Sequence, residues 1–198
     1  MPHTSESLRQ AFGYFYPNEL AMLKALVYLC PASPITVVNI GAGAGTSGLA
    51  FLETRLDLHL HTVDITNIDS PFGSLYSERQ VCQDAGFKLG DRWHQHHMDS
   101  KQLAQWWDYG PVDVCFIDGD HTYEGASGDI IGWLPHMRTG GFMAVHDYRK
   151  QDVAKPDDGQ VRPHPLEWHD VDKAVDEFLK SQYEVFALVE SLIVFQVK

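Results

Sequence analysis

Short apolar runs alternate along this chain with segments in which apolar residues recur at helical spacing. Runs typical of buried strands cover residues 35–40, 58–64, 92–97, 112–117 and 141–146. Segments typical of helices cover residues 18–29, 46–52, 77–85 and 123–134, and Asn18 is the predicted N-cap of the first. Strands that alternate with helices in this way predict a parallel sheet covered by helices on both faces.

The last fifty or so residues break this alternation. Residues 148–169 are rich in Pro, Asp, Lys and His and show no periodicity, which is typical of a functional or mobile loop. Asp170 then begins a helix with one apolar face, and two apolar runs follow at 183–189 and 192–197. Strands joined by so short a link are antiparallel neighbours. The pattern therefore predicts a three-layer α/β sandwich whose mostly parallel sheet ends in one antiparallel hairpin.

Length and charge narrow the classes of function. The 198 residues suit one domain, and 27 acidic against 15 basic residues give a net charge of −12. Because an acidic surface repels phosphates, neither nucleic acid nor a membrane surface is expected as a partner. No apolar run approaches the roughly 18 residues that cross a bilayer. Three cysteines far apart in the sequence suit a reducing compartment, so we predict a single cytoplasmic domain over residues 1–198.

A glycine-rich segment directly follows the first predicted strand. Gly41, Gly43 and Gly45 allow a sharp turn and let the backbone come within contact distance of a ligand. Asp64 ends the next strand, where a carboxylate can accept hydrogen bonds from both hydroxyls of a ribose. The two features predict a nucleoside cofactor. Gly43, Gly45 and Gly48 also have the G-x-G-x-x-G spacing of dinucleotide sites, which keeps an NAD(P)-dependent oxidoreductase as the second hypothesis.

Acidic and imidazole side chains stand at the ends of two further predicted strands. Asp118, Asp120 and His121 follow the fourth strand, and His146 and Asp147 follow the fifth. Ligands of open α/β sheets bind beyond the carboxyl ends of the strands, so these groups are expected at one edge. Asp118 and Asp147 are the best candidates for a divalent ion such as Mg²⁺. His146 as a third ligand would shift the preference towards a transition metal.

Three stretches of the sequence resemble the class I S-adenosylmethionine-dependent methyltransferases: VVNIGAGAGTSGLAF, TVDI and VDVCFIDGDHTYEGASGDIIGWLPHMRTGGFMAVHDY. The last is similar to the subgroup of macrocin- and rhamnosyl-type O-methyltransferases. The resemblance covers roughly residues 35–148. It implies a Rossmann-like seven-stranded sheet of order 3-2-1-4-5-7-6 with the last strand antiparallel. In this architecture we expect residues 1–34 to form a helical cover and residues 149–169 to form a loop on the substrate side.

Position by position, the resemblance places the methionine part of the cofactor against the glycine loop, the ribose on Asp64 and the adenine beside Met98 and Asp99. Asp99 has an equal alternative as the N-cap of a helix beginning near Ser100. Many family members have an acidic residue where this chain has Asn39, which offers no full charge to the cofactor's ammonium group. The predicted cofactor-binding residues are Asn39, Gly41, Ala42, Gly43, Gly45, Thr46, Asp64, Ile65, Asp99 and Asp118.

The acidic and imidazole cluster resembles that of catechol-type O-methyltransferases, in which a metal at these strand ends chelates two substrate oxygens. The resemblance implies that Asp118, His146 and Asp147 bind a metal that lowers the pKa of the acceptor hydroxyl. His121 and Asp118 are the predicted catalytic residues, with His121 as the general base. Alternatively, Asp118 only lines the cofactor pocket and His121 packs at the helix start. Asp129, on the next helix, is expected to face solvent or to neutralise a neighbour.

The sequence thus predicts an S-adenosylmethionine-dependent methyltransferase that acts on a hydroxyl of a small molecule. A nucleoside-cofactor-binding domain without catalysis remains an alternative, since Asn39 replaces the usual acid. Acceptor specificity is expected from residues 12–17, 65–77 and 148–169. The aromatic segment 12–17 is also expected to cover the cofactor or a partner subunit, which leaves a homodimer open. His94 and His96 share one face of their strand. We favour an ordinary polar strand there over a metal site.

Overall fold

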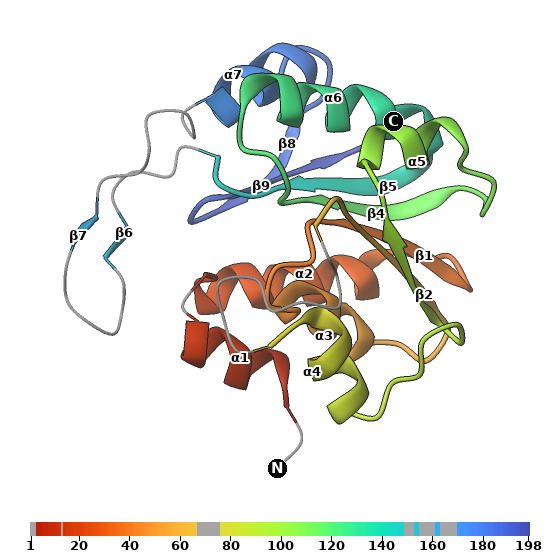
Figure 1. Cartoon of the computed structure of the whole chain (residues 1–198). Coiled ribbons are helices and arrows are strands. Elements are labelled where there is room, and N and C mark those ends of the chain that lie inside the picture. Colours follow the sequence, from red (N-terminus) through yellow and green to blue (C-terminus); the bar gives the residue numbers. More distant parts are fainter. Residues whose placement is uncertain (1–2, 13, 67–75, 149–152, 155–160, 163–169) are drawn as a thin grey trace.

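The computed structural model describes residues 3–12, 14–66, 76–148, 153–154, 161–162 and 170–198. At its centre a seven-stranded sheet lies between helices (Figure 1). In spatial order the strands are β3 (Trp93–His97), β2 (Leu58–Asp64), β1 (Ile35–Ile40), β4 (Val112–Ile117), β5 (Met137–Val145), β9 (Leu192–Gln196) and β8 (Val185–Val189). Neighbours from β3 to β5 pair in parallel, whereas β9 runs antiparallel to both β5 and β8. The predicted order 3-2-1-4-5-7-6, with the last strand antiparallel, is confirmed.

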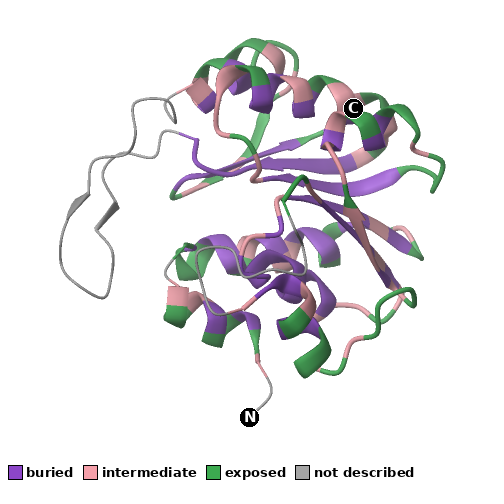
Figure 2. Cartoon of the chain, viewed as in Figure 1, coloured by how far each residue is buried: buried purple, intermediate pink, exposed green. Residues whose placement is uncertain are grey.

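Helices cover the sheet in two layers. One layer contains α1 (Ser5–Phe12), α2 (Pro17–Leu29), α3 (Thr46–Leu52) and α4 (Glu78–Asp84). The other contains α5 (Ser100–Gln105), α6 (Tyr123–Trp133) and α7 (Asp170–Phe178), and a short 3-10 turn, η1 (Leu134–His136), leads from α6 into β5. Buried residues concentrate on the sheet and on the helix faces turned towards it (Figure 2).

Alternation along the strands divides the hydrophobic core into two halves. Val37 of β1 and Leu60 of β2 pack with the first helical layer, whereas Val38 and Val63 pack with the second. Because successive side chains of a strand point to opposite faces, a strand buried on both faces is apolar throughout. This explains why β1 and β4 stand out so clearly in the sequence.

The N-terminal helices differ from the predicted pattern at two points. The sequence does not predict α1, because Ser5 and Leu8 are its buried residues and no long apolar face develops. The N-cap of α2 is Tyr16, so the prediction of Asn18 was wrong. The Glu19 carboxylate accepts a 2.9 Å hydrogen bond from the Tyr16 backbone N–H, which places the cap two residues before the predicted one.

Two of the segments predicted to set specificity for the methyl acceptor consist largely of residues outside the described part of the chain. Of the predicted loop at 149–169, the structure describes only a small ribbon of β6 (Val153–Ala154) and β7 (Val161–Arg162). Residues 67–75, after β2, also lie outside it. Among the helices that are described, none has the length and apolar character needed to cross a membrane.

Candidate active site

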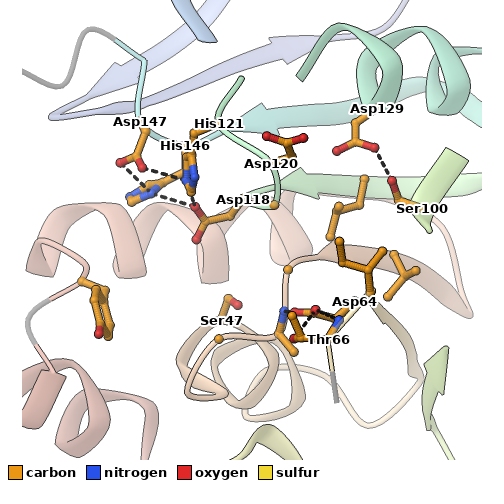
Figure 3. Close-up of a pocket in the computed structure, with 18 of the residues that line it drawn as sticks. Ser47, Asp64, Thr66, Ser100, Asp118, Asp120, His121, Asp129, His146 and Asp147 are labelled. Atoms are coloured by element: carbon orange, nitrogen blue, oxygen red, sulfur yellow. Dashed lines mark hydrogen bonds and ion pairs between the residues drawn. The ribbon is translucent and has the colours of Figure 1, made fainter. Parts of the chain in front are cut away.

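A cavity of about 430 Å³ opens at the carboxyl ends of β1 to β5 (Figure 3). Its volume lies in the range of small-molecule sites, roughly 300–1,000 Å³. Tyr14 and Phe15, from the aromatic segment before α2, contribute to its wall. Asn39 and Gly45 are buried behind the lining. The predicted site residues that line the cavity are Gly41, Ala42, Gly43, Thr46, Asp64, Ile65, Asp99, Asp118, His121, His146 and Asp147.

The glycine loop between β1 and α3 has no room for side chains at two of its positions. A Cβ on Gly41 would lie 2.1 Å from the Asp118 carbonyl oxygen, and one on Gly45 would lie 2.5 Å from Val81 Cγ2. Both glycines have positive φ angles, +92° and +85°. Gly43 is different, because nothing lies within 4 Å of where its Cβ would be. The loop therefore fits tightly against β4 and α4 while its middle stays open to a ligand.

Asp64 connects the end of β2 to the glycine loop. Its Oδ2 accepts a 2.8 Å hydrogen bond from the Ala42 N–H. Its Oδ1 accepts bonds from the Thr66 N–H (2.8 Å) and hydroxyl (2.6 Å). A carboxylate has about four lone-pair positions, so about one remains for a ribose hydroxyl.

Asn39 lies beneath the loop. Its Nδ2 donates to the Gly41 carbonyl at 3.3 Å, and its buried Oδ1 has no hydrogen-bond partner among the described residues. Behind it, Thr62 donates a 2.8 Å hydrogen bond to Glu78, which the sequence analysis did not single out. Burial raises the pKa of Glu78 to about 7, although hydrogen bonds from Gln95 and Thr62 oppose this rise. Asn39 Nδ2 also lies 3.4 Å from Thr62 Oγ1, so three hydrogen bonds connect this partly ionised carboxyl group to the glycine loop.

Carboxylates and imidazoles from β4 and β5 meet at the other end of the cavity, as predicted from their strand ends. His121 Nε2 lies 3.0 Å from Asp147 Oδ2 and 3.5 Å from Asp118 Oδ1. His146 Nδ1 lies 3.2 Å from Asp118 Oδ1, and its Nε2 lies 3.2 Å from Glu19 Oε2 of α2. The structure therefore adds the buried Glu19 to the cluster. Sequence spacing gives no sign of this contact, because 127 positions separate Glu19 from His146.

The carboxylates hold both imidazoles as cations. Burial alone would lower the pKa of His121, but Asp118 and Asp147 outweigh it and raise the value to about 9. Burial likewise opposes the protonation of His146, and Asp118, Asp147 and Glu19 raise its pKa well above the ordinary range. A general base must be neutral before it accepts a proton. In this arrangement His121 is therefore an ion-pair partner, and its role as a general base stays a prediction.

The cluster also contains the donor set of a metal site. Among the described residues, Asp118, His121 and Asp147 offer ligand atoms that all lie within 4.8 Å of one another. His146 was the predicted third ligand; its Nδ1 lies 3.2 Å from Asp118 Oδ1 and 3.2 Å from Asp147 Oδ1, while its Nε2 faces Glu19. The structure thus brings both imidazoles, His121 and His146, beside the two carboxylates. Two carboxylates and one imidazole suit a divalent cation.

The opposite end of the cavity holds Asp99 and Asp129. Asp99 acts as the N-cap of α5, because its carboxylate accepts a 2.8 Å hydrogen bond from the Lys101 N–H. Asp129 of α6 is only 2% exposed, so the expectation that it faces solvent was wrong. It accepts a short hydrogen bond from the Ser100 hydroxyl, and it lines the cavity. Its burial raises the pKa of Asp129 to about 6.

The chain is similar to known proteins both in sequence and in fold. Residues 38–148, more than half of the chain, match a family model described as a methyltransferase domain. No curated protein sequence matches the chain.

Solved structures with this fold are similar over nearly the whole chain. A candidate caffeoyl-CoA O-methyltransferase from Staphylococcus aureus has a TM-score of 0.74 at 16% identity, covering 98% of this chain and 92% of its own. The SAH-bound methyltransferase PaMTH1 from Podospora anserina has a TM-score of 0.70 at 15% identity, with coverage of 100% and 89%. The O-methyltransferase TomG from Streptomyces achromogenes, in complex with SAM, has a TM-score of 0.67 at 16% identity, with coverage of 98% and 88%. At such identities the likeness shows a shared fold.

Proposed function

This chain belongs to the methyltransferase domain family and is an S-adenosylmethionine-dependent methyltransferase, and on that premise we propose that it methylates a hydroxyl oxygen of a small molecule. The proposal is supported by one cavity that joins the glycine loop to the carboxylates and imidazoles of β4 and β5. Similar structures include O-methyltransferases, one of them in complex with SAM. The finer assignment to the macrocin and rhamnosyl type rests on the sequence resemblance.

The residues around the cavity fit this cofactor. The open middle of the glycine loop at Gly43 suits close contact with a ligand, and the unpartnered Oδ1 of Asn39 leaves an acceptor beneath it. We assign the methionine end to the glycine loop, the ribose to Asp64 and the adenine to the Met98 end. When bound, S-adenosylmethionine supplies an electrophilic methyl group. The protein orients the acceptor oxygen for in-line attack and excludes water, since the thioether leaving group needs no acid.

The acidic cluster is proposed to activate the acceptor. Asp118 and Asp147 would hold a divalent cation such as Mg²⁺, with His121 outside its coordination shell, and the Lewis-acid charge would lower the pKa of the acceptor hydroxyl. His121 Nε2 is proposed to take the hydroxyl proton, and it becomes available when Asp118 and Asp147 no longer hold it as an imidazolium ion. Glu19 and Asp118 fix His146 between them. The cytoplasmic location, the homodimer and the single domain stay predictions.

Isothermal titration calorimetry tests the cofactor assignment. We expect the protein to bind S-adenosylhomocysteine and not NADH. Incubation with methyl-labelled S-adenosylmethionine and a panel of phenols, catechols and sugars then tests the acceptor class. Binding of NADH without S-adenosylhomocysteine, or transfer to nitrogen or sulfur acceptors alone, would contradict the proposal, and any methyl transfer would exclude a non-catalytic domain.

A cation titration of two variants tests the metal assignment. Asp147→Asn keeps a residue type that tolerates the φ of +60° at this position and removes one ionised oxygen ligand. We expect it to weaken Mg²⁺ binding by about tenfold or more. The matched control is Asp120→Asn, since Asp120 is exposed in the same loop and lies outside the donor set. Equal Mg²⁺ affinity in wild type and both variants would remove the metal from the proposal.

A further inference from the structure

We propose that Asp129 selects adenine at the nucleoside end of the cavity, by accepting a hydrogen bond from the exocyclic amino group of the base. The inference rests on the proposed function, because it takes S-adenosylmethionine as the occupant. It assigns Asp129 a role in cofactor specificity that neither the sequence pattern nor the strand ends indicate.

Asp129 lies where the nucleoside end of the cofactor is assigned. It projects from α6 towards Ser100, the first residue of α5, and Met98 lines the cavity just before this helix. Figure 3 shows Asp129 and Ser100 turned towards each other, at the opposite end of the drawn pocket from His146 and Asp147. The cluster of Asp118, His121 and Asp147 and the carboxylate of Asp129 therefore lie at opposite ends of the cavity, the first on the side assigned to the acceptor and the second on the side assigned to the nucleoside.

One oxygen of the Asp129 carboxylate is held and the other is available. Oδ1 accepts the hydrogen bond from the Ser100 hydroxyl, which fixes the orientation of the group. Among the described residues, this is the only hydrogen bond to the Asp129 carboxylate. Oδ2 points towards Gly119, where even an added Cβ would remain 3.7 Å away. Gly119 also lines the cavity, so its missing side chain leaves room beside Oδ2.

Burial makes a hydrogen bond from a ligand to this second oxygen favourable. The residue is 2% exposed and lines the cavity, so a donor inside the cavity meets little competition from water for this oxygen. An ionised carboxylate can only accept hydrogen bonds. Adenine presents an amino donor, whereas hypoxanthine presents a carbonyl oxygen at the same ring position. The carboxylate would therefore attract the first base and repel the second.

Asp99, predicted from the sequence as the adenine partner, is already engaged elsewhere. Its carboxylate caps α5 through the Lys101 N–H and forms a 3.3 Å ion pair with Lys101 Nζ. Asp99 is also more exposed than Asp129, so water competes for its free lone pairs. Of the two carboxylates, Asp129 is the one whose surroundings favour a ligand donor.

A base-swap experiment tests the inference. Affinities for S-adenosylhomocysteine and S-inosylhomocysteine are measured by calorimetry at pH 8, where Asp129 is ionised. We expect the wild type to prefer the adenine compound by about tenfold or more, as for loss of a hydrogen bond to a charged group. Asp129→Asn keeps the acceptor for Ser100 and adds a donor that can meet a carbonyl oxygen. This variant is expected to shrink the preference by about tenfold or to reverse it.

Two further measurements keep the result interpretable. Asp99→Asn is the matched control, and its effect on the preference is expected to be smaller than that of Asp129→Asn. An N6,N6-dimethyl analogue of S-adenosylhomocysteine, which has no amino donor, is expected to bind the wild type about tenfold less tightly, and this needs no variant. An unchanged preference in Asp129→Asn, or equal wild-type affinity for the dimethyl analogue, would overturn the inference. Failure of the wild type to bind S-adenosylhomocysteine at all would instead contradict the proposed function.

Discussion

Gly41 lacks a side chain for two separate reasons, its backbone angle and its distance from the next strand. A Cβ here would lie 2.1 Å from the Asp118 carbonyl oxygen, and φ is +92°. We expect Gly41→Ala to cost about 3–5 kcal/mol of unfolding free energy, from the left-handed conformation and the overpacking together. It should also abolish binding of S-adenosylhomocysteine, because the loop must move away from β4. Chemical denaturation and calorimetry measure the two effects.

Gly86 provides the control for Gly41, because it has nearly the same angle without the clash. Its φ is +94°, and nothing lies within 4 Å of where its Cβ would be. Gly86→Ala should therefore cost only the conformational part, about 1–2 kcal/mol, and leave cofactor binding unchanged. Equal losses of stability in the two variants would show that the contact with Asp118 is unimportant.

Glu19 is a buried carboxylate with hydrogen-bond partners in three separate parts of the chain. Oε1 accepts from the Ser191 N–H (2.8 Å) and hydroxyl (2.7 Å), while Oε2 accepts from the Tyr16 N–H and lies 3.2 Å from His146 Nε2. Burial alone would raise the pKa of Glu19, but His146 and these donors lower it. Glu19→Gln turns an amide NH₂ towards other donors, so we expect a loss of about 3–5 kcal/mol in urea denaturation.

An exposed glutamate separates this effect from the general loss of a negative charge. Glu184 is exposed just before β8, and Glu184→Gln should change stability by no more than about 0.5 kcal/mol. If Glu19→Gln is as stable as Glu184→Gln, the bonds of Glu19 to His146 and Ser191 do not stabilise the fold.

Single residues were predictable from the sequence only where chain position decides their place. Asp118 and Asp147 follow strands of a parallel sheet, so their meeting at one edge could be expected. Asp129 could not be placed, because its burial depends on how closely α5 approaches α6. Nor could Glu19, because the sequence contains no information on the distance between α2 and the end of β5.

At the scale of elements, β2 and β3 carry a row of histidines on one face. His61 Nδ1 lies 3.1 Å from His96 Nε2, and the rings stack in the order His59, His94, His61, His96, alternating between the two strands. Trp107 and Tyr109, which follow α5, contact the His61 ring from outside. Burial, reinforced by the neighbouring imidazoles, lowers the pKa of His61 to about 3. Burial also lowers the pKa of His94 and His96, so these two rings and His61 pack as neutral aromatic surface at pH 7.

Acid should consequently weaken the β2–β3 edge. Between pH 6.5 and 3 the unfolded chain binds a proton at His61 and the folded chain does not. The unfolding free energy therefore falls as the pH decreases through this window, by at most about 1.4 kcal/mol for each pH unit from this residue. Urea denaturation from pH 7 to 4 measures the slope, and His61→Gln should flatten it. His97→Gln, at an exposed position of β3, is the control for the loss of an imidazole as such. A slope unaffected by His61→Gln would contradict this assignment.

Elements were predictable in proportion to how much apolar surface they bury. β1 and β4 are buried on both faces, and their predicted bounds agree with the structure. β5 begins at Met137, four residues before the predicted start, because Arg138 and Thr139 extend the strand with polar side chains. α1 buries little and is held partly by Ser5, whose N–H donates a 2.8 Å hydrogen bond to the distant Glu53. Such a contact leaves no periodic signal in the sequence.

At the scale of the whole molecule, the site spans five neighbouring strands. Residues from the carboxyl ends of β3, β2, β1, β4 and β5 all line one cavity. Asp64, Asp99, Asp118 and Asp147 place part of the acidic charge along this edge, and His121 and His146 offset only the last two. A cationic cofactor therefore reduces local repulsion while it connects elements from both helical layers.

A ligand held in this way should stabilise the chain as one unit. At a concentration of one hundred times its dissociation constant, S-adenosylhomocysteine should add about 2.7 kcal/mol to the unfolding free energy. For a chain of this length that corresponds to a rise in Tm of roughly 5–10 °C. Differential scanning calorimetry should show a single transition that moves as a whole, because the cavity lining comes from both halves of the sheet. NADH at the same concentration should not move it, and neither should S-adenosylhomocysteine with Gly41→Ala. A scan in which only part of the transition shifts would show that the two halves of the sheet unfold independently.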